Sequence, residues 1–306
     1  MYDVVNKEFY MRNKKNFIWF ILIGVVVLIG CVLFIGSEVK FKNKKLAKEL
    51  YERLEADYIY PIYVNDFDTY IDSNFYNDKL VTYDDLSDES KLYYAYQIIE
   101  NKKQLKLRDC GELKLYKYNE EDLYAKCLRD EDMIRKDIEY DGDWVFEDVN
   151  KEKLENAYHK LFGEDKEMPL KQFTKLFVGA CTYSKEKDDF LCFNQVGGKE
   201  IGSRPETKFE KYKKKKDSIE IYDRYVWVEV KDGFENYVNT YYKSRLKEDK
   251  FASETYNYRK YEGEVGLNLE KPELKDEIFK QGALYKHVFK KDKNGNYYWY
   301  SSERIE

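Results

Sequence analysis

An uninterrupted apolar run near the start of the chain is the strongest pattern in the sequence. Residues 17–36 read FIWFILIGVVVLIGCVLFIG, twenty positions without a charged side chain. A helix rises 1.5 Å per residue, so this run can span about 30 Å of hydrocarbon. A buried helix of a soluble core would normally carry polar positions on one face. The pattern therefore predicts a transmembrane helix over residues 17–36.

Basic residues flank this predicted span on both sides, so charge alone does not set its orientation. The sixteen residues before it contain four Lys or Arg, and the sixteen after it contain five. A short basic tail, then an apolar run, then a long domain is the usual layout of an uncleaved signal anchor. We therefore expect a single-pass protein of the cell membrane, with residues 1–16 as the cytoplasmic tail and the C-terminal domain extracytoplasmic.

Cys31 offers a second interpretation of the same run. Leu28-Ile29-Gly30-Cys31 resembles the lipobox of bacterial lipoproteins, in which the cysteine becomes lipid-modified after cleavage. However, residues 32–35 continue the apolar run where a lipoprotein normally becomes polar. A membrane-embedded cysteine is the simpler interpretation, and lipidation remains the alternative.

Helical periodicity continues after the predicted span. Leu46, Leu50 and Leu54 recur every four residues, which predicts an amphipathic stalk helix over residues 37–60 that stops before Pro61. The stalk would continue the membrane helix.

Two further helices have recognisable ends. Ser87 is a good N-cap for a helix that extends to about Ile99, with acidic residues in its first turn. Asn150 is the expected N-cap of the next helix, and Gly163 is its expected stop.

After Gly163 the hydrophobic period changes from 3.6 to 2, which predicts strands. Residues 175–184 and 190–194 are expected to form one hairpin with a four-residue loop. Residues 218–231 are expected to form a long strand. Its apolar positions change phase between Ile221 and Val226, so we expect a bulge or bend around Asp223.

The clearest hairpin lies at the carboxyl end. It joins residues 283–290 to residues 296–305 through Asp292-Lys293-Asn294-Gly295, where Asn and Gly are expected to supply positive φ values. Helices followed by an antiparallel sheet, which can be curved, predict an α+β fold. We expect a mainly helical lobe over residues 61–148 and an α+β lobe over residues 149–306.

Composition and charge narrow the function classes. The 306 residues are 43% hydrophobic and 17% aromatic with only 4 Pro, which excludes collagen-like and low-complexity chains. The 54 Lys and Arg against 59 Asp and Glu give a net charge of −5, so no nucleic-acid partner is expected. Residues 1–16 hold four of the basic and two of the acidic groups, so residues 37–306 carry −7.

Four cysteines lie outside the predicted span and form two local pairs. If residues 185–188 form the hairpin loop, Cys181 lies directly opposite Cys192, close enough for a disulfide. Cys110 and Cys127 form the second candidate pair. Disulfides would agree with an oxidising, extracytoplasmic location, and four reduced thiols in a cytoplasmic domain are the alternative.

A basic cluster is the one candidate ligand site in the sequence. On an exposed domain it can bind anionic wall polymers or lipid headgroups, and the alternative is a charged hairpin tip that protects a sheet edge. Its members are Lys208, Lys211, Lys213, Lys214, Lys215 and Lys216.

The histidines and acidic runs match no catalytic or metal-binding spacing. His159 is expected on the polar side of its helix, and His287 is expected to pack in a strand without an identifiable partner. The runs at 130–132 and 141–143 do not match a calcium loop. No catalytic residue, cofactor or metal ligand is therefore assigned.

The chain resembles uncharacterised single-pass membrane-anchored proteins of low-GC Gram-positive bacteria. The resemblance rests on the basic tail and apolar run and on the segments DDLSDESKLYYAYQIIE, KLENAYHKLFG and YKHVFKKDKNGNYYWYSSERI, at residues 84–100, 153–163 and 285–305. It implies a membrane-anchored extracytoplasmic α+β domain and no established activity.

These observations favour a non-enzymatic binding or protein-interaction module of the cell envelope. Its expected partners are the lipid bilayer and a cell-wall polymer or another envelope protein. An envelope hydrolase or transferase with carboxylate catalysis is the first alternative. A cytoplasmic-facing, membrane-tethered regulatory domain is the second.

Overall fold

A computed structural model describes ten stretches of the chain. They are residues 41–54, 75–100, 102–105, 109–129, 144–175, 179–195, 204–233, 236–244, 249–257 and 274–306. The predicted span at 17–36, with Cys31, and the acidic runs at 130–132 and 141–143 lie outside them. No helix in the described part of the chain has the length and apolar character needed to cross a membrane. Met1–Glu49 and Leu50–Glu306 form two separate compact units.

Residues 41–52 are helical, within the range in which the sequence predicts a stalk. Residues 37–40 and 55–60, the two ends of that range, lie outside the described stretches.

The caps expected for the next two long helices are present. α2 (Asp88–Gln97) begins at Ser87, whose side chain accepts a hydrogen bond from a backbone N–H of the first turn. α4 (Lys151–Phe162) begins at the N-cap Asn150 and ends at Gly163, which has a φ of 100°. A positive φ suits glycine because a Cβ would be strained there. The shorter helices are η2 (Tyr83–Asp85), η3 (Cys110–Leu113), α3 (Leu123–Arg129) and α5 (Asp276–Gln281).

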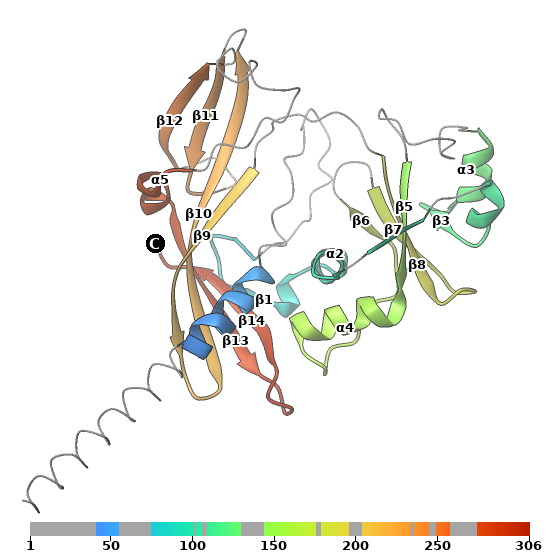
Figure 1. The fold of residues 1–306 in the computed structure, drawn as a ribbon, viewed down its shortest axis with the longest axis horizontal. Helices are drawn as coiled ribbons and strands as arrows, with labels where there is room; N and C mark the ends of the chain where they lie inside the picture. The colour runs from blue at the N-terminus through green and yellow to red at the C-terminus, as the bar shows by residue number, and fades with distance from the viewer. Residues whose placement is uncertain are drawn as a thin grey trace, which may run out of the picture. The chain divides into compact units, whose positions relative to one another are not determined.

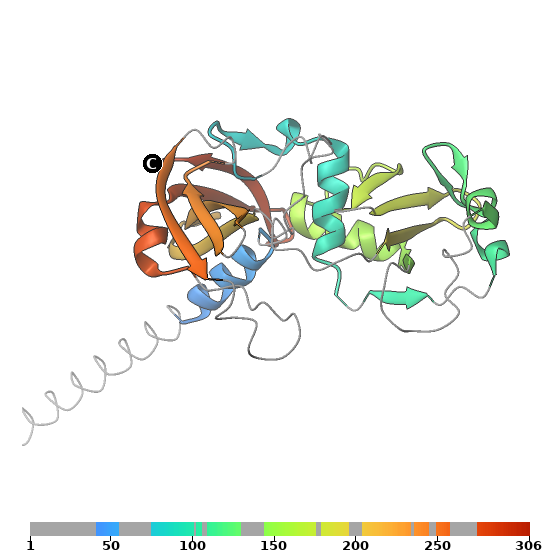
Figure 2. The same ribbon diagram turned by 90° about the horizontal axis from the view of Figure 1, so that it is seen from above.

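A seven-stranded antiparallel sheet is built from β1 (Val81–Thr82) and from the strands between residues 204 and 304 (Figure 1). Its path is β1, β14 (Tyr297–Arg304), β13 (Ala283–Lys291), β10 (Ser218–Gly233), β11 (Asn236–Tyr242) and β12 (Lys250–Asn257), and β9 (Arg204–Lys214) pairs with β10. Register shifts occur in three of its pairings, and such bulges bend strands. Seen from above, the sheet is curved (Figure 2).

A bulge is present at the predicted position beside Asp223, but it lies in β9 and does not cause the change of apolar phase in β10. The register with β9 shifts between Tyr222 and Asp223, and the extra residue is Glu210 of β9. β10 itself keeps its alternation. Its change of apolar phase arises because its first half buries one face, including Ile221, and its second half buries the opposite face against α5, including Val226.

A five-stranded antiparallel sheet has the order β2 (Lys103–Leu105), β5 (Trp144–Asn150), β8 (Asp189–Gln195), β7 (Gly179–Ser184) and β6 (Phe173–Lys175). The predicted single strand over residues 175–184 is wrong, because Lys175 pairs with Gly179 and the chain reverses between β6 and β7. The loop register is confirmed, with Ser184 opposite Asp189. A small ribbon pairs β3 (Lys117–Tyr118) with β4 (Glu121–Asp122).

The carboxyl-terminal hairpin is present as β13 and β14, with one correction in its turn. Gly295 has a φ of 87°, as expected, but Asn294 does not have a positive φ. Instead, Asp292 Oδ1 accepts hydrogen bonds from the N–H groups of Asn294 and Asn296, each at 2.8 Å. The aspartate therefore closes a turn for which the sequence predicts two positive φ values.

Aromatic side chains join the helices to the seven-stranded sheet. Trp299 of β14 is buried, and its ring lies 4.7 Å from that of Phe75 and 6.1 Å from that of Phe162 of α4. Phe75 stacks on Tyr94 of α2 at 4.3 Å. A fully buried aromatic side chain contributes about 1.5–3 kcal/mol through the apolar surface it removes from water.

The α+β class is confirmed, since the described chain combines short helices with antiparallel sheets. β1 pairs with the last strand, β14, and β5 runs through residue 148. The division into two lobes at residue 148 stays a prediction.

Candidate functional site

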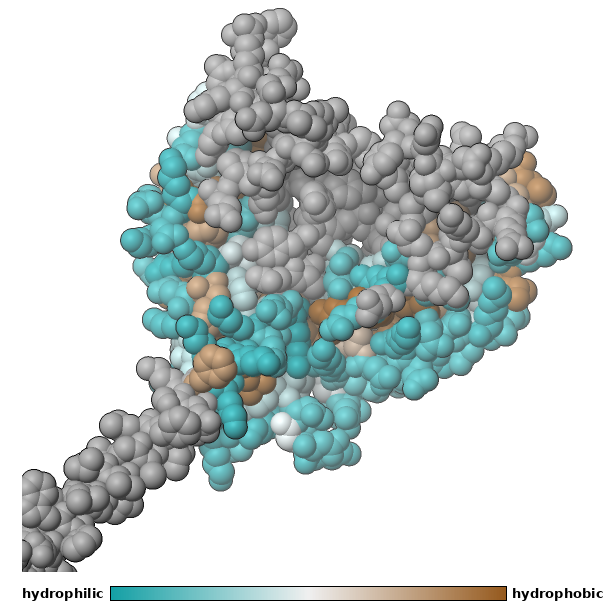
Figure 3. Space-filling model, viewed as in Figure 1, coloured by the Kyte–Doolittle hydropathy of each residue, from teal (hydrophilic) through white to brown (hydrophobic). Residues whose placement is uncertain are grey.

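Two lysine-rich turns meet at one end of the seven-stranded sheet. The β9–β10 and β13–β14 turns are neighbours because Ser218 pairs with Lys290 and the Lys291 N–H donates to the Asp217 carbonyl at 3.0 Å. Both turns lie at the lower edge of the sheet in Figure 1, and Figure 3 shows hydrophilic residues there. The lysines of this surface, here named the basic end, are Lys213, Lys214, Lys215, Lys216, Lys290, Lys291 and Lys293.

Tyr297 lies at the centre of the basic end. Lys214 Nζ donates to its hydroxyl at 2.7 Å, and Lys291 Nζ lies 5.4 Å from the centroid of its ring. Its carbonyl accepts a hydrogen bond of 2.7 Å from Arg53 Nη1. Tyr297 is itself buried, and an ammonium group over an aromatic ring gains about 0.5–2 kcal/mol, so these lysines are positioned by the tyrosine.

Carboxylates balance only part of this charge. Residues 213–220 and 290–297 hold seven lysines and three carboxylates, those of Asp217, Glu220 and Asp292. Glu164 adds a fourth carboxylate, which accepts a hydrogen bond from Asn294 at 2.6 Å. Glu220 accepts bonds from Lys215 and Tyr222. Burial alone would raise the pKa of Glu220, but these bonds outweigh it and hold that pKa below its ordinary value. The basic end therefore keeps a positive surplus.

The structure separates the six lysines that the sequence groups together. Lys213 to Lys216 lie at the basic end, whereas Lys208 and Lys211 lie farther along β9. Lys208 forms an ion pair with Asp276, and Lys211 Nζ lies 5.3 Å from the ring centroid of Tyr222. β9 pairs only with β10 among the described strands, so these lysines also line a sheet edge.

Sequence reasoning missed the contribution of Lys290, Lys291 and Lys293. They lie more than seventy residues after the β9–β10 turn, and only the strand register brings them beside it. The sequence feature that could have indicated them is the presence of two lysine-rich turns, each between two strands with alternating apolar and polar residues.

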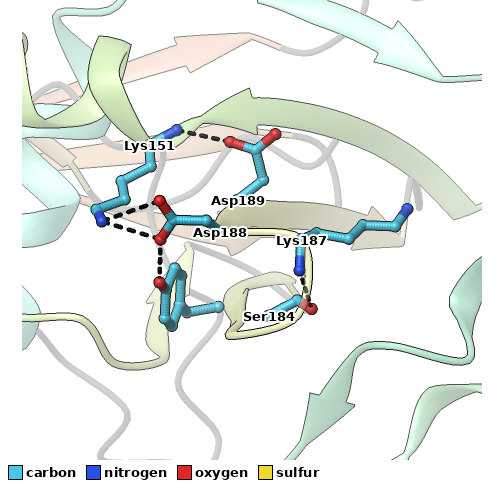
Figure 4. Close-up of polar contacts among 6 residues, drawn as sticks. Lys151, Ser184, Lys187, Asp188 and Asp189 are labelled. Atoms are coloured by element: carbon cyan, nitrogen blue, oxygen red, sulfur yellow. Dashed lines mark hydrogen bonds and ion pairs between the residues drawn. The ribbon is translucent and has the colours of Figure 1, made fainter.

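A second polar cluster fixes the β7–β8 turn to the start of α4 (Figure 4). Lys151 Nζ donates to both carboxylate oxygens of Asp188 at 2.9 and 3.1 Å, and Tyr183 also donates to this carboxylate. The bonds from Tyr183 and Lys151 lower the pKa of Asp188. The Lys151 N–H donates to Asp189 Oδ1 at 2.8 Å. These bonds complete the helix terminus, so the cluster is structural.

A third cluster is fully buried and contains Asp223, His287 and Ser302. His287 Nε2 lies 3.0 Å from Asp223 Oδ1, and its Nδ1 lies 2.5 Å from Ser302 Oγ. Tyr76 donates to Asp223 Oδ2 at 2.6 Å, and Trp299 Nε1 donates to Ser302 Oγ at 2.8 Å.

Both ring nitrogens of His287 have a partner within this cluster, Nε2 with Asp223 and Nδ1 with Ser302. Ser302 Oγ also accepts from Trp299, whose indole can only donate. His287 packs in a strand as expected from the sequence, and its side chain is buried. Its partners were missed because they lie 15 and 64 residues away.

The cluster has the Ser, His and Asp of a hydrolase triad, but a substrate cannot reach its serine. Ser302 is fully buried and already bonds to both Trp299 and His287, so its oxygen has no open side toward a substrate. We assign it the structural role of joining β10, β13 and β14.

The cysteine pairing predicted from the sequence is confirmed. Cys181 lies opposite Cys192 in the β7–β8 pair, and the two are joined by a disulfide with a Cα–Cα distance of 3.9 Å. Cys110 and Cys127 form the second disulfide, with Cα atoms 5.6 Å apart, and join η3 to α3. Each bridge closes a short loop, for which chain entropy gives about 2–3 kcal/mol of stability.

The remaining candidates show no ligand chemistry. His159 is half-buried rather than fully solvated, because its Nε2 lies 3.0 Å from the Lys166 carbonyl. Within the described stretches, no group of His, Cys, Asp and Glu side chains could hold a metal ion.

Comparisons with known proteins assign no family. No family model, curated protein or solved structure matches the chain.

Proposed function

We propose that the chain is a membrane-anchored, extracytoplasmic binding module of the cell envelope, non-enzymatic, which binds an anionic ligand at its basic end. The observation that carries this proposal is the meeting of two lysine-rich turns around Tyr297. Seven ammonium groups from two hairpins give a surface with a positive surplus on a domain whose total charge is negative. Such a local reversal of sign favours anionic ligands.

The two disulfides support the extracytoplasmic location. Structural disulfides persist in oxidising compartments and are rare in the cytosol. The uncharged run at 17–36, with a short basic segment before it, supports anchoring with the domain outside the cell.

The location is tested by thiol labelling of intact cells that express the full chain. A membrane-impermeant maleimide should label Cys110, Cys127, Cys181 and Cys192 only after treatment with an impermeant reductant. Labelling that requires lysis but no reductant would place the domain in the cytoplasm and favour the regulatory alternative.

Binding is tested with the full chain in detergent micelles and polyphosphate as the probe. A triple variant should weaken binding at least about tenfold, because each substitution removes a charge near the ligand. It carries Lys213→Gln, Lys216→Gln and Lys293→Gln. The matched control removes three exposed charges elsewhere and should leave binding unchanged; it carries Lys153→Gln, Lys185→Gln and Lys250→Gln. Equal loss in both triple variants would show that only net charge matters and would contradict a specific surface.

A further inference from the structure

We infer that the anionic ligand of the basic end is the headgroup layer of the same membrane that holds the chain. This inference rests on the proposed function, since it names the ligand of the surface proposed there. The docked partner is thus an anionic lipid surface, reached in cis.

The length of the connecting chain supports a ligand in cis. Residues 41–52 are helical, so the nine residue-to-residue steps from Phe41 to Leu50 rise about 14 Å. The five steps from Gly36 to Phe41 span at most about 18 Å when fully extended. By chain length alone, Leu50 therefore lies within about 32 Å of the end of the predicted span.

The chain reaches the basic end directly after this segment. Arg53 donates to the carbonyls of Tyr297 and Lys160 at 2.7 and 2.8 Å. Tyr297 also accepts the bond from Lys214, so a single residue connects the incoming chain to the lysines. The segment where the tether enters the domain is thus bonded to Tyr297 of the basic end, as well as to Lys160 and Thr207.

The chemistry of the surface fits lipid headgroups. Lys213, near the end of β9, and Lys216 and Lys293, in the two turns, are exposed. Their flexible ammonium groups can reach phosphates without a shaped pocket. Basic residues near an anionic leaflet gain attraction that falls off within a Debye length. A tether of this length keeps them within repeated reach of the bilayer, which raises their effective concentration at its surface.

The test compares the full chain in two kinds of nanodisc, one of phosphatidylcholine alone and one that also contains phosphatidylglycerol. Lysine acylation by a water-soluble ester, mapped by peptide mass, reports the exposure of each ammonium group. We expect Lys213, Lys216 and Lys293 to react about fivefold more slowly in the anionic discs. This protection should disappear at about 1 M salt, where the Debye length is about 3 Å. Lys185, in the β7–β8 turn, is the internal control and should react equally in both discs.

A third sample separates failure of this inference from failure of the proposed function. Soluble polyglycerol phosphate is added to the full chain in phosphatidylcholine discs. Protection by this polymer, without protection by anionic lipid, would overturn the lipid assignment and favour a wall polymer, while the binding function stands. No protection in any sample would overturn both.

The lysine variants provide a second readout. In anionic discs, the triple variant at 213, 216 and 293 should expose the remaining lysines Lys214 and Lys291 to faster acylation. The control triple variant at 153, 185 and 250 should leave their protection intact. Unchanged protection of Lys214 in the first variant would contradict docking through these turns.

Discussion

Asp223 Oδ1 lies 3.0 Å from Nε2 of His287, and both side chains are fully buried. The pair joins adjacent strands, since Asp223 faces Tyr285 and His287 faces Ile221 in the β10–β13 register. Tyr76 bonds the second carboxylate oxygen, so the pair also holds a segment from outside the sheet. Because these polar groups are buried, removal of one leaves the others without a hydrogen-bond partner, which costs stability.

Replacing Asp223 therefore provides the first prediction. Asp223→Ala should lower the free energy of unfolding by about 3–5 kcal/mol, because it leaves His287 and Tyr76 buried without their acceptor. Asp223→Asn retains an acceptor oxygen for His287 and should cost about 1–2 kcal/mol. Chemical denaturation at neutral pH measures both.

Two results would contradict the structural role of Asp223. Equal stabilities for the Ala and Asn variants would show that the hydrogen bonds do not matter. A loss below about 1 kcal/mol for Asp223→Ala would show that the site is hydrated or open.

Local patterns predicted the elements whose signals lie within a few residues. The caps at Ser87, Asn150 and Gly163 each satisfy their own helix end, so they can be recognised without knowledge of the fold. The opposition of Cys181 and Cys192 followed from one loop length, because the side-chain period of a strand fixes every later pair.

Features that depend on distant pairing could not be predicted. The Asp223 partner of His287 and the meeting of the two lysine-rich turns both follow from the β10–β13 register, which no local pattern specifies. Ser302 lies opposite His287 in the β13–β14 hairpin. The prediction of one strand over residues 175–184 was wrong for a related reason. An apolar run has the same sequence pattern whether the chain continues straight or turns back on itself. Here the chain turns back, because Lys175 pairs with Gly179.

Gly282 provides the second prediction. A Cβ at this position would lie 2.5 Å from the Tyr225 carbonyl oxygen and 2.7 Å from Val226 Cγ2. The backbone and the buried valine cannot both move aside, so Gly282→Ala should cost about 1–3 kcal/mol.

Gly295 is the matched control for this substitution. It has a φ of 87°, but a Cβ there would meet no atom within 4 Å. Asn tolerates the left-handed region, so Gly295→Asn should cost less than about 1 kcal/mol in the same denaturation experiment. A larger loss at Gly295 than at Gly282 would reverse the prediction.

Asp189 provides a prediction of pH dependence. Burial, with the nearby carboxylates of Asp148 and Asp188, raises the pKa of Asp189 despite its bond from the Lys151 N–H. A raised carboxyl pKa means that the folded state holds the proton more tightly than the unfolded state. Ionisation therefore costs stability at neutral pH, and this cost disappears as pH falls below the unfolded value of about 3.9.

Asp189→Asn removes the charge and keeps an oxygen for the Lys151 N–H. The variant should be at least as stable as the native chain at pH 7, and the difference should shrink on acidification toward pH 3. Unfolding by denaturant across this range measures the difference. A variant that is less stable at pH 7 and equal at pH 3 would show that attraction to the helix terminus exceeds the cost of burial.

Buried tyrosines predict how the fold responds to alkali. Burial is the main cause that raises the pKa of Tyr96, Tyr116, Tyr158 and Tyr285 above the ordinary value. The folded state favours their neutral form, so their contribution is fully present below the unfolded value of about 10. It is lost as pH rises above that value, because only the unfolded chain ionises there.

Tyrosinate absorbance followed with pH should therefore rise in two phases. The late phase belongs to the buried tyrosines, which ionise only as the chain unfolds. Tyr285→Phe should reduce this late phase by one residue. A single phase near pH 10, with circular dichroism unchanged, would mean that water reaches these hydroxyls in the folded protein.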